Sequence, residues 1–516
     1  MKLGNLFATY RGDNVPKSTS VVYCGASIFR DACYQLVASF LITYITFAGV
    51  LDVSSTEAYL AQMLVINMFI IFCRIWDGIN DPIMGWIIEK VKFKWGKYKP
   101  WILLGGVLNS AVVLTLFLAR PSGWGFVALF CVFYFLWDIV YTINDIAYWS
   151  MLPSLTSNEK KRNKITSAMQ VCISIGVFAV YGAVPMLIVP GQAALSYSVI
   201  AIVITILFLA SQIALVFICK ERDRAEIDAL SLGENVSAKD MLSVFKNNSQ
   251  FRVSIIAILI NYLGGGVLVG FAMYYFYLMY GYGPDLGGSI QFIFTVMYAI
   301  GTLVAQLLYP LLIKKFNRKQ LLLLAASIFS IGYIGLFFLG FPLFGGAPLA
   351  SGSLIVLLYI TAVLIFFGQG IIAIIIIIQM QSTIEYNEWK TGKRQESIVS
   401  SMRALAAKFG SAIQQGLIYA TLALTGLYGI TEIISNCENQ VNSGLMTKEQ
   451  LNESVALALQ GIEQWQLAGL SIGMVVVPLL LMLTSTFLCA FVFKIDEKMY
   501  DTMLNDIKQR KAEITQ

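Results

Sequence analysis

The chain has 516 residues, of which 58% are hydrophobic and only 13% are charged, and its formal net charge is +6. Because soluble domains carry about 25% charged residues, this composition excludes water as the main solvent of the chain. Histidine is absent, which excludes any mechanism that needs a histidine base, proton relay or metal ligand. The positive charge requires no nucleic-acid partner, because its distribution along the chain has a simpler cause.

Apolar runs of about 20 residues, long enough to cross about 30 Å of hydrocarbon, recur from Tyr23 to Phe493. Backbone polar groups must be satisfied within lipid, so these runs are predicted to be helices. Residues 1–20 lack an apolar core with a cleavage site, and we expect no removable signal peptide. Of the eight cysteines, only Cys437 lies in a polar segment, so we also expect no disulfide framework.

Lysine and arginine crowd every second loop, while the loops between them are nearly bare of both. By the positive-inside rule the basic loops are cytoplasmic, and an even number of crossings places both termini there too. We therefore predict an all-α membrane protein with twelve transmembrane helices, in the bacterial cytoplasmic (inner) membrane. The basic loops are Lys90 to Lys99, Lys160 to Lys164, Lys220 to Lys246, Lys314 to Lys319 and Lys390 to Arg394.

The longest polar interruption separates six predicted crossings from six more. We predict an N-terminal six-helix bundle over 1–220, a cytoplasmic linker over 221–250 and a C-terminal six-helix bundle over 251–516. Two such bundles that rock about a site near the membrane midplane define the major facilitator architecture. A further polar segment, near 430–464, is predicted to be an external, solvated cap.

The second predicted helix buries two carboxylates, Asp77 and Asp81, at positions i and i+4 with Asn80 beside them. Each ionisable group at the bilayer centre costs about 3 kcal/mol, so the pair needs protons, a cationic partner or a bound ion. The fourth predicted helix adds Thr142 on the facing stripe.

Hard monovalent cations prefer several oxygen ligands. Two carboxylates, an amide and a hydroxyl supply them, so this set fits sodium. Structural pairing of Asp77 or Asp81 with Arg74 or Lys408 is the alternative, and the two roles are compatible.

The fourth helix continues the same stripe to Asp145 and Trp149, and it also contains Asp138, which we leave unassigned. Neutral sugars are bound by carboxylates that accept from their hydroxyls and by an aromatic face against the ring. Asp31, Asp145 and Trp149 are therefore a candidate sugar site. A tryptophan near a helix end is more often an interfacial anchor, and that alternative stays open.

Several motifs along the chain closely resemble the glycoside-pentoside-hexuronide:cation symporters. The resemblance implies sugar uptake driven by sodium, lithium or protons, with the cation bound by the same four residues. It places sugar contacts on Arg30, Asp31, Asp145 and Trp149. It also matches Lys408 to a lysine that the family carries in its eleventh membrane crossing. The motifs that carry it are Arg74 to Gly85, Trp95 to Leu103, Tyr141 to Pro153, Gly270 to Phe276 and Glu385 to Ser397.

The sequence departs from the family pattern at two candidate substrate positions. Gln170 stands where a typical member has a sugar-contacting arginine, and Arg403 adds a positive charge to the same predicted membrane crossing as Lys408. These departures put the particular sugar in doubt more than the cation. With Lys408, Arg403 also allows an acidic or lipid-like solute as cargo, and a hexuronide satisfies both possibilities.

The predicted function is secondary active transport: cation-coupled symport of a sugar by alternating access, with sodium as the coupling ion and lithium or protons as alternatives. The predicted partners are a small sugar, a monovalent cation and the lipid bilayer, without a cofactor and with an unassigned oligomeric state. An enzyme is not expected, because no nucleophile–base constellation or metal-ligand cysteine spacing is present. A membrane sensor would usually carry a soluble signalling domain, and the tail after Lys494 is too short for one.

Overall fold

The computed structural model describes residues 9–12, 14–91, 93–156, 158–222, 245–341, 348–349, 351–392 and 396–515. Most of the predicted linker, 221–250, lies outside these residues. Within them the chain is almost entirely helical, and it forms two compact units. The first unit contains Met1–Gly233 together with Gly281–Phe292 and Gly426–Gly461, and the second contains the rest. Two short segments of the C-terminal half thus pack with the first unit.

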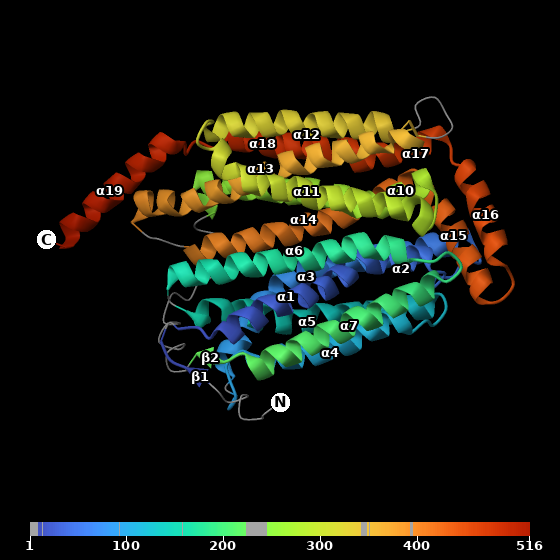
Figure 1. The fold of residues 1–516 in the computed structure, drawn as a ribbon, viewed down its shortest axis with the longest axis horizontal. Helices are drawn as coiled ribbons and strands as arrows, with labels where there is room; N and C mark the ends of the chain where they lie inside the picture. The colour runs from blue at the N-terminus through green and yellow to red at the C-terminus, as the bar shows by residue number, and fades with distance from the viewer. Residues whose placement is uncertain are drawn as a thin grey trace. The chain divides into compact units, whose positions relative to one another are not determined.

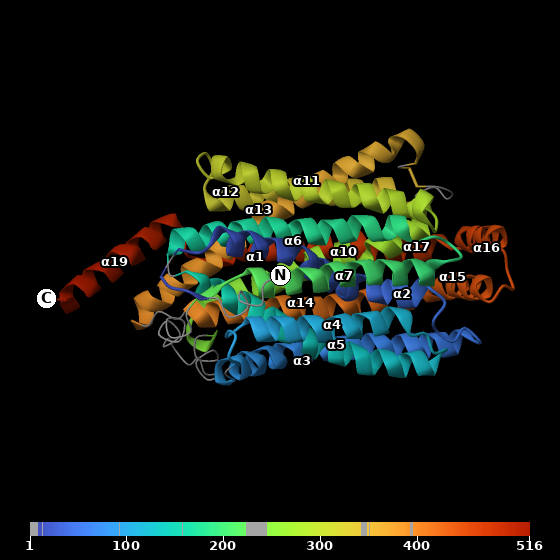
Figure 2. The same ribbon diagram turned by 60° about the horizontal axis from the view of Figure 1, so that its bottom comes forward.

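The long helices of the first unit lie side by side, with α1 against α6 and α7, and α5 against α3 and α4 (Figures 1 and 2). The elements of this unit are β1 (Thr9–Tyr10), α1 (Lys17–Gln35), the π-helical turn η2 (Leu36–Phe40), α2 (Leu41–Phe47), α3 (Thr56–Lys90), α4 (Lys99–Leu118), α5 (Trp124–Leu155), α6 (Glu159–Leu187), α7 (Ala193–Ile218), β2 (Glu221–Arg222), η3 (Pro284–Gly288), α15 (Leu427–Asn442) and α16 (Lys448–Gln460).

The second unit packs α10 against α14 and α18, and α12 against α13. Its elements are α10 (Ser249–Tyr280), most of α11 (Ser289–Leu312), α12 (Arg318–Gly340), η4 (Gly352–Leu354), α13 (Ile355–Thr391), α14 (Glu396–Leu424), α17 (Gln464–Ser471), η5 (Ile472–Val476), α18 (Val477–Phe487), η6 (Leu488–Val492) and α19 (Glu497–Thr515).

Ten helices among the described residues are long and apolar enough to cross a membrane. An eleventh is counted if the pair Leu405–Leu424 and Leu427–Asn442, bent by 89°, forms one span. The continuous segment formed by α1, η2 and α2 is not among these, because charged side chains lower its apolarity. The predicted all-α, multi-pass architecture is confirmed, whereas the number twelve and the cytoplasmic termini stay predictions.

Close helix contacts in the first unit depend on glycines that leave no room for a side chain. A Cβ on Gly176 of α6 would lie 2.1 Å from the Ile28 carbonyl oxygen of α1. A Cβ on Gly105 of α4 would lie 2.6 Å from the backbone nitrogen of Asn144 on α5. Asn144 also donates a hydrogen bond to the Ile102 carbonyl at 2.9 Å. These contacts fix α1, α4, α5 and α6 against one another, and with them the side chains of the candidate site.

A buried glutamate joins three parts of the first unit that are far apart in sequence. The Glu221 carboxylate accepts hydrogen bonds from the backbone N–H groups of Lys97, Tyr98 and Lys99, at 2.6, 3.0 and 2.6 Å. Lys99 is the first residue of α4, and a helix leaves its first N–H donors unpaired; Lys97 and Tyr98 directly precede it. Burial raises the pKa of Glu221, and the three donors oppose that shift. Since β2 also pairs in parallel with β1, one carboxylate holds the start of α4 beside the N-terminal strand.

The polar segment predicted to be an external, solvated cap consists of α15 and α16, and one side of α15 is buried. Glu438 of α15 is fully buried, and its carboxylate accepts from the backbone N–H groups of Gly191 and Ala193 and from the Tyr282 hydroxyl. Cys437 is buried as well. The composition of the segment is polar, but its buried acid is satisfied by backbone donors that only the fold brings to it. α16 is mostly exposed.

Candidate functional site

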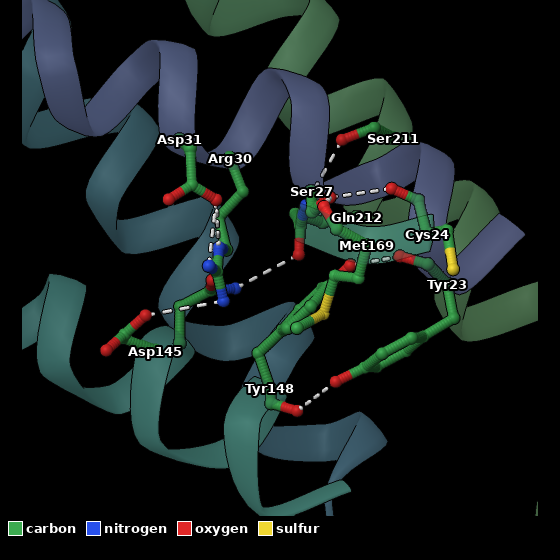
Figure 3. Close-up of polar contacts among 11 residues, drawn as sticks. Tyr23, Cys24, Ser27, Arg30, Asp31, Asp145, Tyr148, Met169, Ser211 and Gln212 are labelled. Carbon is green, nitrogen blue, oxygen red and sulfur yellow. Dashed lines mark hydrogen bonds and ion pairs between the residues drawn. The ribbon is translucent and has the colours of Figure 1, made fainter. Parts of the chain in front are cut away.

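Arg30 on α1 lies at the centre of a buried polar cluster with Asp31 and Asp145 (Figure 3). Its side chain is 1% exposed, and its Nη2 atom lies 2.8 Å from Asp31 Oδ2. Its Nη1 atom lies 3.3 Å from Asp145 Oδ1 on α5. The two carboxylates are 16% and 29% exposed, so part of each remains available to a ligand. The structure thus brings together three of the predicted substrate residues.

Two stacked tyrosines adjoin this cluster, and one of them contacts Arg30. The guanidinium carbon of Arg30 lies 4.2 Å from the ring centroid of Tyr148, within the range of a cation–π contact. The Tyr148 ring stacks on Tyr23 at 4.6 Å, and each hydroxyl donates to the other residue's backbone carbonyl (Figure 3). No role was predicted for Tyr148 or Tyr23 from the sequence. The available signal was their helical spacing: Tyr148 lies three residues after Asp145, and Tyr23 lies seven residues before Arg30.

Trp149 and Gln170 differ in their relation to the cluster. The Trp149 ring centroid lies 5.3 Å from the Arg30 guanidinium carbon, and the side chain is half-buried. This places an aromatic face beside the carboxylates, as predicted for a sugar platform. Gln170 on α6 is exposed and makes no hydrogen bond within the described part of the chain. With glutamine in place of the arginine that is typical of the family, position 170 therefore makes no direct contact with the Arg30 cluster.

The predicted cation residues lie on α3 and α5. Thr142 Oγ1 donates to Asp77 Oδ1 at 3.4 Å. Thr142 and Asn80 are buried, while Asp77 and Asp81 are half-buried. The Nδ2 atom of Asn80 is buried and has no hydrogen-bond partner among the described residues. A hydroxyl and a carboxylate are thus in contact, and Asn80 lies one helical turn from Asp77 on α3. The oxygens of these three side chains are of the kind that a monovalent cation takes as ligands.

Arg74 and Asp138 extend the cation residues on the side of α5. Arg74 is 8% exposed and interacts electrostatically with Asp77 and Asp138. Its guanidinium also lies 5.9 Å from the ring centroid of Trp137. The predicted alternative, in which Arg74 balances Asp77, is therefore physically present beside the cation set. Asp138, left unassigned by the sequence, is 4% exposed and belongs to this neighbourhood.

Tyr34 of α1 and Tyr141 of α5 lie between the two groups of acidic residues. The Tyr34 hydroxyl accepts a hydrogen bond from Arg74 Nη1 at 3.2 Å. Its ring lies 4.8 Å from the ring of Tyr141, which interacts electrostatically with Arg30 and Asp145. The sequence placed Tyr141 on the α5 stripe, but Tyr34 was missed. Its spacing of three residues from Asp31 could have found it.

The remaining two predicted substrate residues, Arg403 and Lys408, lie on α14 of the second unit. Arg403 Nη1 donates to the Tyr262 hydroxyl of α10 at 3.4 Å, within the same unit. Both cationic side chains are half-buried, although their helix is otherwise largely apolar. Such residues in a membrane helix usually face protein or a water-filled cavity.

Comparison with solved structures shows which fold the chain adopts. The crystal structure of a D-xylose-proton symporter superposes with a TM-score of 0.54 over 91% of this chain and 96% of that chain, at 16% identity. This similarity shows the fold, which is that of the major facilitator transporters.

Comparison with known sequences then defines the family. A raffinose carrier protein of Pediococcus pentosaceus is 26% identical over 415 residues, covering 77% of this chain and 61% of the carrier. This chain therefore spans about three fifths of the length of that relative. A glucuronide carrier protein homolog of Escherichia coli (strain K12) is 22% identical over 414 residues, covering 79% of this chain and 84% of the homolog.

A family model described as MFS/sugar transport protein matches residues 31–497. The chain therefore belongs to the MFS/sugar transport proteins, as a glycoside-pentoside-hexuronide:cation symporter family member within the major facilitator superfamily. This confirms the family predicted from the motifs. The members and structural neighbours are transporters rather than enzymes.

Proposed function

We propose that this chain is a cation-coupled sugar symporter of the cytoplasmic membrane, with sodium as the coupling ion. The observation that carries the proposal is the position of Thr142 and Asp145, less than one turn apart on α5. Thr142 donates to Asp77 at 3.4 Å, and Asp145 lies 3.3 Å from Arg30. One rigid helix thus contributes to both clusters, and the raffinose carrier among the relatives supports a sugar as cargo.

In the proposed mechanism, Asp31 and Asp145 accept hydrogen bonds from sugar hydroxyls, and Arg30 orients both carboxylates. The Trp149 ring offers an apolar face to the sugar ring. Asp77, Asn80, Asp81 and Thr142 surround the cation, which lowers the repulsion between the two carboxylates. A cation that fixes α3 against α5 also fixes Asp145, so each ligand raises the affinity for the other.

Uptake into membrane vesicles under imposed sodium, lithium or proton gradients tests this function. We expect a sodium gradient to drive accumulation of a neutral glycoside, and a proton gradient alone to drive much less. Accumulation under a proton gradient but not under a sodium gradient would show that the coupling ion is the proton rather than sodium. Uptake of every sugar tested that is indifferent to all three gradients would contradict symport.

An acidic cargo is a second candidate, favoured by Arg403 and Lys408 and by the glucuronide carrier homolog among the relatives. A hexuronide would pair its carboxylate with these two cations. Substitution Arg403→Gln separates the cargoes. Loss of uptake confined to glucuronides supports the acidic cargo, whereas equal loss for neutral glycosides assigns Arg403 to packing against Tyr262.

A further inference from the structure

Polar side chains continue along the first membrane helix beyond the Arg30 cluster. Gln35 and Ser39 follow Asp31 at intervals of four residues, and all three are partly exposed. The residues beside them on the helix, Leu36, Val37 and Phe40, are buried apolar side chains. A polar, accessible line on an otherwise apolar membrane helix faces a protein-lined cavity rather than lipid.

The π-helical turn η2 keeps this line straight. In an α-helix, positions four residues apart drift by about 40° around the axis. Gln35 and Ser39 bracket most of the π turn Leu36–Phe40, which holds more residues per turn and so reverses that drift. Asp31, Gln35 and Ser39 therefore align along one side of the helix, over a rise of about 12 Å. That length exceeds one pyranose ring and suits a disaccharide.

Tyr181 of α6 completes a hydrogen-bonded group with these two residues. Gln35 Nε2 donates to the Tyr181 hydroxyl at 2.5 Å and also to Ser39 Oγ. The Ser39 and Tyr181 hydroxyls lie 2.9 Å apart. Phe40 packs against the Tyr181 ring at 5.7 Å and holds it in place. Gln35 Oε1 accepts no hydrogen bond from the described residues, so the partly exposed group contains a carbonyl acceptor beside two hydroxyls.

We propose that Gln35, Ser39 and Tyr181 form a second sugar subsite, which binds the second ring of a disaccharide or larger glycoside. The first ring lies at Arg30, Asp31 and Asp145. This inference rests on the proposed sugar transport and deepens it, since it assigns the cargo to oligosaccharides rather than monosaccharides. Hydroxyls and amides at this spacing match the alternating donors and acceptors of a sugar ring.

The competing explanation is a purely structural bond between α1 and α6, which already meet at Gly176. The first unit contains a matched case of such a bond. Thr43 Oγ1 and the Tyr197 hydroxyl lie 3.0 Å apart between α2 and α7, but both side chains are fully buried. Tyr197→Phe therefore removes the same chemical group, with the same ring retained, at a position that is closed to a ligand by burial.

The test measures affinities of the purified full chain for lactose, raffinose and cellobiose, each paired with the methyl glycoside of its terminal sugar. We expect Tyr181→Phe and Gln35→Leu to weaken binding of at least one oligosaccharide about five- to tenfold, the effect of one lost hydrogen bond. Binding of its methyl glycoside stays within about twofold in both variants. Tyr197→Phe changes neither affinity, and thermal unfolding of all three variants confirms that they are folded.

Equal losses for oligosaccharide and methyl glycoside, or no loss for either, overturn the second subsite and leave sugar transport standing. A wild-type chain that binds methyl glycosides and prefers none of the oligosaccharides does the same. A wild-type chain that binds no member of the panel, with or without sodium, contradicts the proposed function itself.

Discussion

The two polar clusters on α5 differ in the chemistry of their contacts. The Arg30 guanidinium has a carboxylate on two sides, at 2.8 and 3.3 Å, and an aromatic ring on another. At Thr142, by contrast, the contact is a long hydrogen bond of 3.4 Å from a neutral hydroxyl to the Asp77 carboxylate. The first cluster is built around a guanidinium, whereas the second presents carboxylate and hydroxyl oxygens of the kind that bind a monovalent cation.

Removing the charge of Arg30 is expected to have the largest effect. Arg30→Met leaves Asp31 and Asp145 partly buried beside each other without their cation, which costs about 3 kcal/mol of the free energy of unfolding. Sugar binding is lost with it. Thermal unfolding and sugar titration measure the two effects. Arg30→Lys keeps the charge and retains part of both, so an equal loss in this variant would show that the fork geometry, rather than the charge, holds the cluster.

Removing the charge of Asp77 is expected to affect the ion and spare the fold. Because Asp77 is a proposed ligand of the cation, Asp77→Asn abolishes the stimulation of sugar binding by sodium, about 5- to 150-fold for a coupling of 1–3 kcal/mol. Sugar binding at the low affinity of the ion-free protein remains. Titration with and without sodium measures this. Stimulation that survives in the variant would assign Asp77 to structural pairing with Arg74.

Removing the Thr142 hydroxyl tests the cation set with a smaller change. Thr142→Val keeps the shape of the side chain but removes one neutral ligand, which weakens sodium binding about fivefold. Thr142→Ser keeps the hydroxyl and is expected to bind sodium within about twofold of the wild type. If both variants bind sodium equally well, Thr142 is not a ligand and only supports Asp77.

Removing the Tyr34 hydroxyl is expected to have the smallest effect and to act on the link between the clusters. Tyr34→Phe breaks the 3.2 Å bond from Arg74 while the ring contact with Tyr141 is retained. We expect the coupling factor between sodium and sugar to fall about threefold, with each separate affinity nearly unchanged. A change in the sugar affinity alone would place Tyr34 in the sugar site instead.

Much of the site was predictable because its residues lie close together in sequence. The i, i+4 spacing of Asp77 and Asp81 and the α5 stripe from Asp138 to Trp149 required only helical periodicity. The pairing of Arg30 with Asp145 was not predictable in the same way, because the two residues are 115 positions apart. To predict it, one must know that this part of α1 lies beside α5. For Arg403 the sequence indicated a cation in a membrane helix but not its partner, the Tyr262 hydroxyl.

The ends of the helices were the least predictable part of the fold. Glu221 and Glu438 each lie in a polar segment, where an exposed position is the ordinary expectation for glutamate. Both are buried because backbone N–H groups from distant loops converge on their carboxylates. Neither periodicity nor composition contains that information. The residue that comes closest to indicating the Glu221 site in the sequence is the glycine at position 96. It has a positive φ of 142°, and it lies in the turn that packs against the Glu221 carboxylate.

The central claim is that ion and sugar are coupled through α5, and reciprocal titration of the purified full chain tests it most directly. The sugar dissociation constant is measured at zero and saturating sodium, and the sodium dissociation constant at zero and saturating sugar. We predict that both fall by the same factor, as linkage requires, and that the factor becomes one in Asp77→Asn. Sugar affinity that is independent of sodium in the wild-type chain would contradict the account.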